Sequence, residues 1–130
     1  MEDVVFSLAR YAVPGLGIAI LAFCAVWLYR RRADSPPAAS LLDLTTGDSR
    51  PLPHWENAVG RHPRCDIVLG YATVSRFHAV ISCRKGGWVL TDTGSRGGTL
   101  VNGDILIKSR PLQNGDALTF GSVTFRFITV

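Results

Sequence analysis

Residues 11–29 form a run of 19 residues without a charged side chain, and the three arginines at 30–32 follow it directly. As a helix rising about 1.5 Å per residue, this run would be roughly 28 Å long, close to the hydrocarbon thickness of a bilayer. Tyr11 at one end, and Trp27 with Tyr29 at the other, suit the two membrane interfaces. The run therefore predicts a transmembrane helix.

A cleaved signal peptide is the competing interpretation, and a buried core helix is the third. A signal peptide has a basic segment before a shorter apolar stretch. Here Glu2 and Asp3 precede the run, and the arginines follow it. We therefore expect a permanent single-pass anchor in the cell membrane. Positive residues stay on the cytoplasmic side, so residues 1–10 are expected outside and the chain after Arg32 in the cytoplasm.

The composition changes after the apolar run. Residues 30–40 form a basic, Pro/Ala-rich juxtamembrane linker, and residues 41–130 form the domain that follows. In this domain short apolar runs alternate with turn signals and show no 3.6-residue period. We expect strands at residues 41–45, 50–55, 58–60, 66–69, 79–84, 87–92, 99–101, 105–108, 117–120 and 123–128. Many short strands at regular spacing predict an all-β sandwich or barrel.

The three cysteines, Cys24, Cys65 and Cys83, are odd in number and lack the spacing of a zinc site or a disulfide framework. Cys83 falls on the apolar face of its strand and is expected to be buried. Cys65 falls in a loop, where its thiol could be exposed. No metal site is expected from these residues.

Two arginines occur in loops on either side of one short predicted strand. Gly60-Arg61 follows one apolar run, and Ser75-Arg76 precedes another. Both loops can therefore converge at one end of the β structure. Two guanidinium groups and a hydroxyl suit a phosphate oxyanion, because arginine binds phosphate bidentately and keeps its charge. For any one arginine alone, an ordinary solvated loop charge is the simpler interpretation.

Three segments together resemble the forkhead-associated (FHA) domain, over roughly the last two thirds of the chain. They are Gly60-Arg61, the segment Ser75-Arg76-Phe77-His78 and residues 98–103, Gly-Thr-Leu-Val-Asn-Gly. The resemblance implies an FHA-type β-sandwich of about 10–11 short strands. It also implies that the domain binds phosphothreonine peptides.

The resemblance assigns roles to individual residues. Arg61 and Ser75 correspond to the phosphate-binding residues, and Arg76 adds a contact to phosphate or peptide. Gly97 stands where the family usually has an Asn that contacts the peptide backbone, and a glycine there loosens the loop and weakens peptide binding. Arg96 adds a compensating charge.

Asn102 corresponds to the family's second Asn, which supports the peptide-binding loops. A turn residue before Gly103 is an equally good interpretation of Asn102. His78 corresponds to a buried histidine whose hydrogen bonds brace the site. Gly60, Gly98 and Thr99 are expected to support the same site.

Two functions remain open. In the first, the chain binds phosphothreonine-containing substrates of a Ser/Thr kinase and recruits them to the cytoplasmic membrane face. In the second, it is a phosphate-independent structural component of an envelope, division or secretion complex. Nucleic-acid binding is disfavoured, because residues 41–130 carry 10 basic and 7 acidic residues and the loops lack interleaved aromatics. No catalytic triad, metal-ligand spacing or phosphate-cradling loop occurs, so neither an enzyme nor a cofactor is expected.

Overall fold

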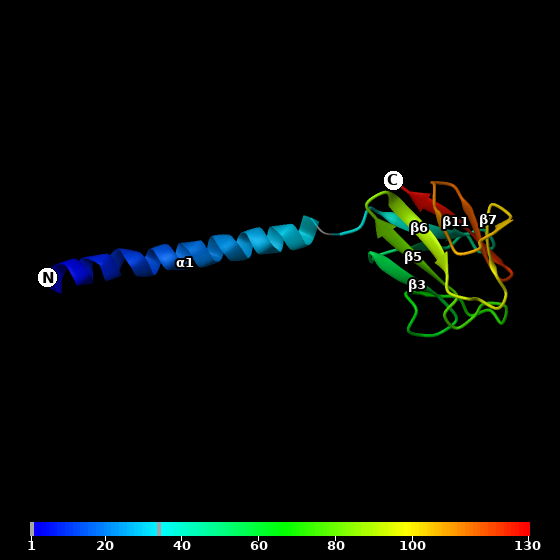
Figure 1. Ribbon diagram of the computed structural model, residues 1–130, viewed down its shortest axis with the longest axis horizontal. Coiled ribbons are helices and arrows are strands. Elements are labelled where there is room, and N and C mark those ends of the chain that lie inside the picture. The colour runs from blue at the N-terminus through cyan, green and yellow to red at the C-terminus, as the bar shows by residue number, and fades with distance from the viewer. Residues whose placement is uncertain (1, 34) are drawn as a thin grey trace. The chain divides into compact units, whose positions relative to one another are not determined.

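The computed structural model describes residues 2–33 and 35–130, which fall into two compact units, Met1–Ser35 and Pro36–Val130 (Figure 1). The first unit is a single helix, α1 (Glu2–Ala33). Within it, Asp3–Arg30 is long and apolar enough to cross a membrane, and the side chains along this span are exposed.

Helix α1 extends beyond the charge-free run at both ends. It begins at Glu2 and continues to Ala33. Pro14 therefore lies in the helix interior. Because proline has no N–H, the carbonyl of Arg10 has no helical donor there. Proline is tolerated inside transmembrane helices where other polar groups satisfy the freed carbonyl.

The second unit is a sandwich of two β-sheets. One sheet has the strand order β2-β1-β11-β10-β7-β8, and the other has the order β4-β3-β5-β6-β9. Strands β3 and β4 pair in parallel, and every other described pair is antiparallel. The strands are β1 (Ala39–Asp43), β2 (Ser49–Pro51), β3 (Glu56–Gly60), β4 (Ile67–Val68), β5 (Ala79–Arg84), β6 (Gly87–Asp92), β7 (Thr99–Val101), β8 (Asp104–Ile105), β9 (Ser109–Pro111), β10 (Ala117–Phe120) and β11 (Val123–Thr129). The predicted all-β sandwich is confirmed.

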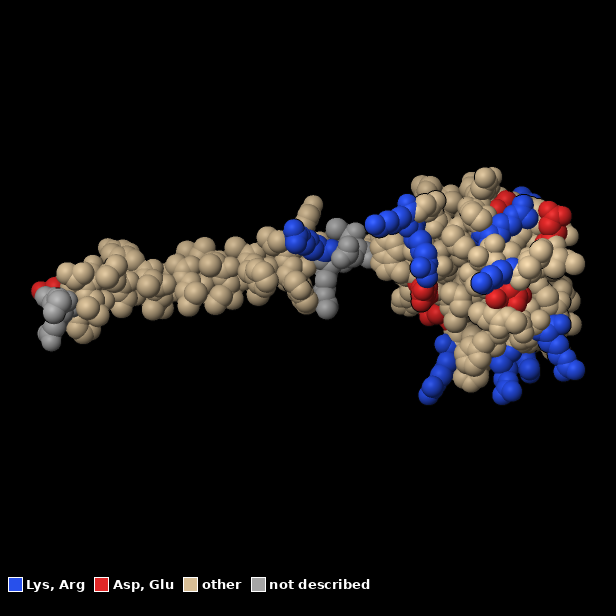
Figure 2. All heavy atoms as spheres, viewed as in Figure 1, with Lys and Arg blue, Asp and Glu red and all other residues tan. Residues whose placement is uncertain are grey.

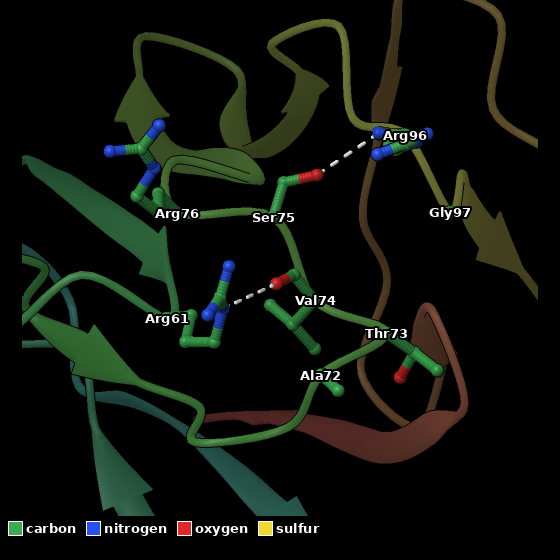
Figure 3. A pocket seen from close by; sticks show the side chains of 8 residues that line it. All are labelled: Arg61, Ala72, Thr73, Val74, Ser75, Arg76, Arg96 and Gly97. Carbon is green, nitrogen blue, oxygen red and sulfur yellow. Dashed lines mark hydrogen bonds between the residues drawn. The ribbon is translucent and has the colours of Figure 1, made fainter.

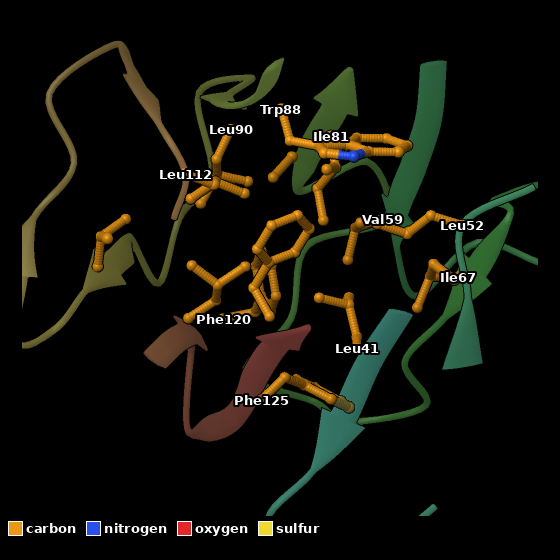
Figure 4. Packing of buried hydrophobic residues seen from close by; sticks show 14 of the residues in the cluster. Leu41, Leu52, Val59, Ile67, Ile81, Trp88, Leu90, Leu112, Phe120 and Phe125 are labelled. Atoms are coloured by element: carbon orange, nitrogen blue, oxygen red, sulfur yellow. The ribbon is translucent and has the colours of Figure 1, made fainter. Parts of the chain in front are cut away.

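The hydrophobic core lies between the two sheets (Figure 4). Strand β11 contributes Phe125 and Phe127, which are fully buried, while Arg126 between them is exposed. The ring of Trp88 on β6 meets Phe127 edge-on, with 6.1 Å between the ring centroids. The alternation of apolar and polar residues in β11 therefore sets which face of the strand covers the core.

The strand predicted at residues 105–108 is wrong. Asp104–Ile105 pairs with β7, and the chain then crosses to the other sheet, where Ser109–Pro111 pairs with β6. Ile105 and Ile107 are 77% and 95% exposed, whereas Leu106 is buried. The prediction failed because the chain changes sheets where one continuous strand was expected.

The strand register defines two opposite ends of the sandwich. At one end Ala39, the first residue of β1, pairs with Thr129 near the end of β11. At the other end lie the β10–β11 turn and the first residue of β7, because Phe120 pairs with both Val123 and Thr99. The chain from the helix therefore enters the sandwich at the end opposite the β10–β11 turn.

Candidate functional site

Three loops meet at the end of the sandwich that carries the β10–β11 turn. They join β3 to β4, β4 to β5, and β6 to β7. Together they form an open pocket lined by Arg61, Ala72, Thr73, Val74, Ser75, Arg76, Arg96 and Gly97 (Figure 3). The pocket thus brings together the candidate residues Arg61, Ser75, Arg76, Arg96 and Gly97.

Gly60 and Arg61 connect β3 to this pocket. A Cβ at Gly60 would collide with the carbonyl oxygen of Arg76, so only glycine lets the two loops approach this closely. The backbone N–H of Arg61 donates to the carbonyl of Ser75 at 3.0 Å. The Nε–H of the Arg61 side chain donates to the carbonyl of Val74 at 3.2 Å. This bond orients the guanidinium and leaves its terminal nitrogens for a ligand.

The hydroxyl of Ser75 is oriented by the third loop. Its Oγ accepts a hydrogen bond from the backbone N–H of Arg96 at 3.0 Å (Figure 3). Since the Oγ acts as the acceptor in this bond, its own proton remains to be donated. The pocket therefore offers the Ser75 hydroxyl and the Arg61 guanidinium as donors from two different loops.

His78 is buried beneath the site and joins the same loops. Its Nδ1 accepts from the backbone N–H of Ser75 at 3.0 Å, and its Nε2 lies 2.9 Å from the carbonyl oxygen of Gly98. These partners assign the proton to Nε2, because a backbone N–H can only donate and a carbonyl can only accept. The histidine is thus placed as a structural brace between the β4–β5 and β6–β7 loops.

Asp92, at the end of β6, holds the β6–β7 loop in shape. Its carboxylate accepts from the backbone N–H groups of Gly94 at 2.7 Å and Ser95 at 2.8 Å. It also accepts from the hydroxyls of Ser95 at 2.5 Å and Thr99 at 2.6 Å. Partial burial alone would raise the pKa of Asp92, but the hydrogen bonds from Ser95 and Thr99 outweigh it and lower the pKa below its ordinary value.

Asp92 was missed by the sequence analysis. The signal that could have found it is an Asp followed three residues later by Ser at the end of a predicted strand. Asp side chains in this position commonly bond to the backbone a few residues on, which shapes the turn.

Gly97 packs tightly against the β4–β5 loop. A Cβ at this position would lie 2.7 Å from the carbonyl oxygen of Thr73, closer than the two atoms can approach without movement. Thr73 is held in turn by a 2.6 Å hydrogen bond between its Oγ1 and the Oγ of Ser122 in the β10–β11 turn. The expectation that glycine loosens this loop therefore does not fit the packing. Gly97 is required where three segments meet.

Asn102 lies in the β7–β8 turn, near the end of the sandwich opposite the pocket. It has a positive φ of 52°, which suits its place as a turn residue before Gly103. Its Oδ1 accepts from the backbone N–H of Ala117 at 2.9 Å, and its Nδ2 donates to Asp116 at 3.0 Å. The structure thus favours the turn interpretation and does not bring Asn102 into the pocket.

Cys65, whose place in a loop left open an exposed thiol, is buried. Its Sγ donates to the carbonyl oxygen of Arg76 at 3.3 Å. Burial raises the pKa of the Cys65 thiol, and the charge of Asp66 adds to this effect. The residue is therefore a neutral packing element beneath the site.

Among the described residues, the arginines of the pocket form no ion pair with a carboxylate. The ion pairs within the described chain are His54–Asp66 at 3.6 Å, Arg84–Glu56 at 3.5 Å and Arg110–Asp104 at 3.6 Å. None of them involves an arginine of the pocket. Figure 2 shows Lys and Arg side chains projecting from the loop end of the sandwich, at its lower right. Across residues 2–33 and 35–130, no three His, Cys, Asp or Glu side chains are arranged to hold a metal ion.

Comparison with known proteins assigns this architecture to a family. Residues 57–121 match the model of the FHA domain. The chain is 36% identical over 101 residues to an oxoglutarate dehydrogenase inhibitor of Corynebacterium efficiens, which covers 74% of the chain and 70% of that protein. It is 35% identical over 98 residues to the glycogen accumulation regulator GarA of Mycobacterium tuberculosis, which covers 72% of the chain and 60% of GarA.

Two solved structures extend the comparison. Mycobacterium tuberculosis EmbR, in complex with a low-affinity phosphopeptide, superposes with a TM-score of 0.68 and 33% identity, covering 72% of the chain and 24% of EmbR. A structure from a study of phosphothreonine-dependent FHA domain interactions superposes with a TM-score of 0.66 and 26% identity, covering 72% of the chain and 97% of that structure. The similarity to GarA and EmbR thus concerns one part of longer proteins. The chain belongs to the FHA domain family, with the β-sandwich of that family in its second unit.

Proposed function

We propose that the chain is a membrane-anchored FHA protein that binds phosphothreonine-containing partners and recruits them to the cytoplasmic membrane face. The pocket is the observation that carries this proposal. Its arginines have no carboxylate partner among the described residues, and its serine hydroxyl has a proton to donate. A phosphate dianion can pair with the arginines and accept the hydrogen bond that the hydroxyl donates.

The donors of the pocket match the chemistry of a phosphorylated side chain. Arg61 approaches with its Nε fixed on Val74, so its terminal nitrogens can form parallel bonds to two phosphate oxygens. Ser75 donates to a third oxygen, and Arg76 lies on the same loop. Charge-assisted hydrogen bonds of this kind are worth about 1.5–3 kcal/mol each. The similarity to EmbR, solved with a phosphopeptide, supports the same ligand class.

Equilibrium binding of labelled peptides to the full-length chain in lipid nanodiscs tests this proposal. A phosphothreonine peptide should bind, and the same peptide with unmodified threonine or with phosphoserine should bind more weakly. Arg61→Ala should abolish the preference for phosphate. Arg126→Ala, on the exposed face of β11, is the matched control and should leave it unchanged. Equal binding of phosphorylated and unmodified peptides would reject the proposal.

Helix α1 supplies the membrane anchor in this proposal. Its span Asp3–Arg30 is long and apolar enough to cross the bilayer, and three arginines end the charge-free run on the cytoplasmic side. Alkaline extraction should leave the full-length chain in the membrane pellet. Protease should digest the β unit in inside-out vesicles and spare it in right-side-out vesicles. Release of the chain into the soluble fraction would contradict the anchor.

The position of the pocket suits recruitment. The linker enters the sandwich at Ala39, whereas the pocket lies at the end that carries Gly121. The body of the domain therefore separates the pocket from the tether. A partner protein can reach the pocket without competing with the chain that leads to the bilayer.

The alternative, a phosphate-independent assembly component, rested on Gly97 in place of the usual Asn. The contact with the Thr73 carbonyl gives Gly97 a packing role, so its presence does not indicate that phosphate binding has been lost. Arg61, Ser75 and Arg76 all line the pocket. The binding function is therefore favoured, and the chain acts through its partner rather than by catalysis.

A further inference from the structure

The positive charge of the pocket exceeds what one phosphate requires. A phosphothreonine carries about −1.5 to −2 charges near neutral pH. Three arginines line the pocket, and none of them has a carboxylate within 4.0 Å in the described part of the chain. Binding one phosphate thus leaves about one positive charge uncompensated. The excess points to a second negative group on the ligand.

Arg96 is the arginine that the phosphate needs least. Arg61 is fixed towards the pocket by its bond to Val74, and Arg76 follows Ser75 on the same loop. Arg96 instead comes from the β6–β7 loop, on the other side of Ser75 (Figure 3). Its side chain is exposed, and no hydrogen bond within the described chain engages its guanidinium. It is free to reach a group beside the phosphate.

The backbone of Arg96 is nevertheless well held. Its N–H donates to the Oγ of Ser75 at 3.0 Å, and the residue before it, Ser95, donates two hydrogen bonds to the carboxylate of Asp92. The same carboxylate also accepts from the N–H of Gly94 and the hydroxyl of Thr99. The Asp92 carboxylate is occupied by these donors and does not pair with the Arg96 guanidinium. A charged side chain on a fixed backbone loses less entropy when it engages a ligand.

Gly97, the next residue, cannot supply a side chain for contact with a group beside the phosphate. A Cβ at Gly97 would lie 2.7 Å from the carbonyl oxygen of Thr73, so the packing excludes a side chain there. The β6–β7 loop therefore presents a guanidinium, and no side-chain amide, to a peptide crossing the pocket. A guanidinium selects for an anion, whereas an amide bonds equally well to neutral backbone groups.

We propose that Arg96 is a specificity-determining residue that recognises a second negative charge beside the phosphothreonine. The preferred ligand is then an acidic phosphothreonine peptide, whose second anion is either an Asp or Glu side chain or a second phosphate. This inference rests on the proposed function, because it needs the first phosphate to occupy Arg61 and Ser75. It adds that the bound peptide carries a negative charge beside its phosphothreonine.

The test measures the affinity of phosphothreonine peptides for the full-length chain in nanodiscs of zwitterionic lipid. One peptide has uncharged residues on both sides of the phosphothreonine. In a set of further peptides, each carries one Glu, at a different position near the phosphothreonine. A third peptide carries a second phosphorylated residue, and a fourth carries Lys at the best Glu position. The Glu and double-phosphate peptides separate the two possible sources of the second anion.

We expect the best acidic peptide to bind about fivefold more tightly than the neutral one, equivalent to about 1 kcal/mol for an exposed charge pair. Arg96→Gln should remove this difference, so that the neutral and the best acidic phosphothreonine peptides bind with equal affinity. Arg96→Glu should reverse it and favour the Lys peptide. Arg126→Gln, which makes the same charge change on β11, should behave as the wild type.

Each other outcome has a distinct meaning. Equal affinity for neutral and acidic phosphothreonine peptides would overturn this inference and leave the proposed function intact. An acidic preference that persists in Arg96→Gln would overturn the assignment to Arg96. Failure of every phosphothreonine peptide to bind would reject the proposed function itself, and the inference with it.

Discussion

The backbone N–H of Arg96 donates to the Oγ of Ser75, and this 3.0 Å hydrogen bond joins loops that are 21 residues apart in sequence. His78 makes a second connection between the same loops, through Ser75 and Gly98. The hydroxyl of Ser75 is therefore oriented before any ligand arrives. A site built this way loses little free energy to reorganisation when it binds.

Gly97→Ala should destabilise the fold, because the new Cβ would lie 2.7 Å from the carbonyl oxygen of Thr73. Relieving such a contact requires a backbone shift, which costs about 1–3 kcal/mol. Gly70→Ala is the matched control, since a Cβ there has no neighbour within 4 Å. Thermal unfolding of the two variants measures the difference. A Gly97→Ala chain as stable as the Gly70→Ala chain would show that the three segments are not tightly packed.

His78→Ala should lower both stability and phosphopeptide affinity. It removes a fully buried ring and leaves the N–H of Ser75 and the carbonyl of Gly98 without their partner. Together these losses cost about 2–4 kcal/mol. His54→Ala is the control, because the His54 side chain is 62% exposed. Chemical unfolding of the two variants provides the comparison, and similar midpoints would contradict the bracing role.

Asp92→Asn should reduce stability by about 1–2 kcal/mol at pH 7, because an amide cannot accept all the hydrogen bonds that the carboxylate accepts. The folded pKa of Asp92 lies below its ordinary value. The unfolded chain therefore binds more protons in acid, and the stabilisation is present above about pH 4 and lost as pH falls further. Unfolding curves at pH 7 and pH 3 should show that the difference in free energy of unfolding between the wild type and the variant is smaller in acid. A difference that stays constant would contradict this role for Asp92.

Arg61→Lys should weaken phosphopeptide binding by at least about tenfold, although it keeps the positive charge. Lysine can replace neither the Nε bond to Val74 nor the paired terminal donors. Peptide titration of the two forms gives the ratio of affinities. If Arg61→Lys binds as well as the wild type, the pocket attracts phosphate through its overall positive charge rather than through directed hydrogen bonds from a guanidinium.

Much of the fold could be predicted from local sequence. The bounds of β5, β6, β7 and β10 agree with the expected strands, because turn residues separate runs whose apolar positions alternate. The wrong strand predictions occur where pairing with strands distant in sequence decides the path of the chain. Nothing local distinguishes Ile107 from a buried strand residue, yet the chain leaves one sheet for the other around it, and its side chain is 95% exposed.

The site was predicted in part for a similar reason. The motif residues Arg61, Ser75 and Arg76 could be placed by their order along the chain, and they line one pocket. Thr73 could not, because its role depends on contacts with Gly97 and Ser122, which are distant in sequence. Asn102 was left open between a motif role and a turn role, and its side-chain bonds to Asp116 and Ala117 favour the turn. Motifs identify residue types, whereas close packing decides which of them meet.

The most direct test of the central claim is an NMR titration of the isotopically labelled full-length chain, in detergent micelles, with a phosphothreonine peptide. The account predicts the largest shifts at the Arg61 Nε–H and at the amides of Ser75, Arg76 and Gly97, with little change at Gly103 in the opposite turn. Binding with shifts confined to the Gly103 turn or to the outer faces of the sheets would contradict it. So would an absence of shifts at saturating peptide.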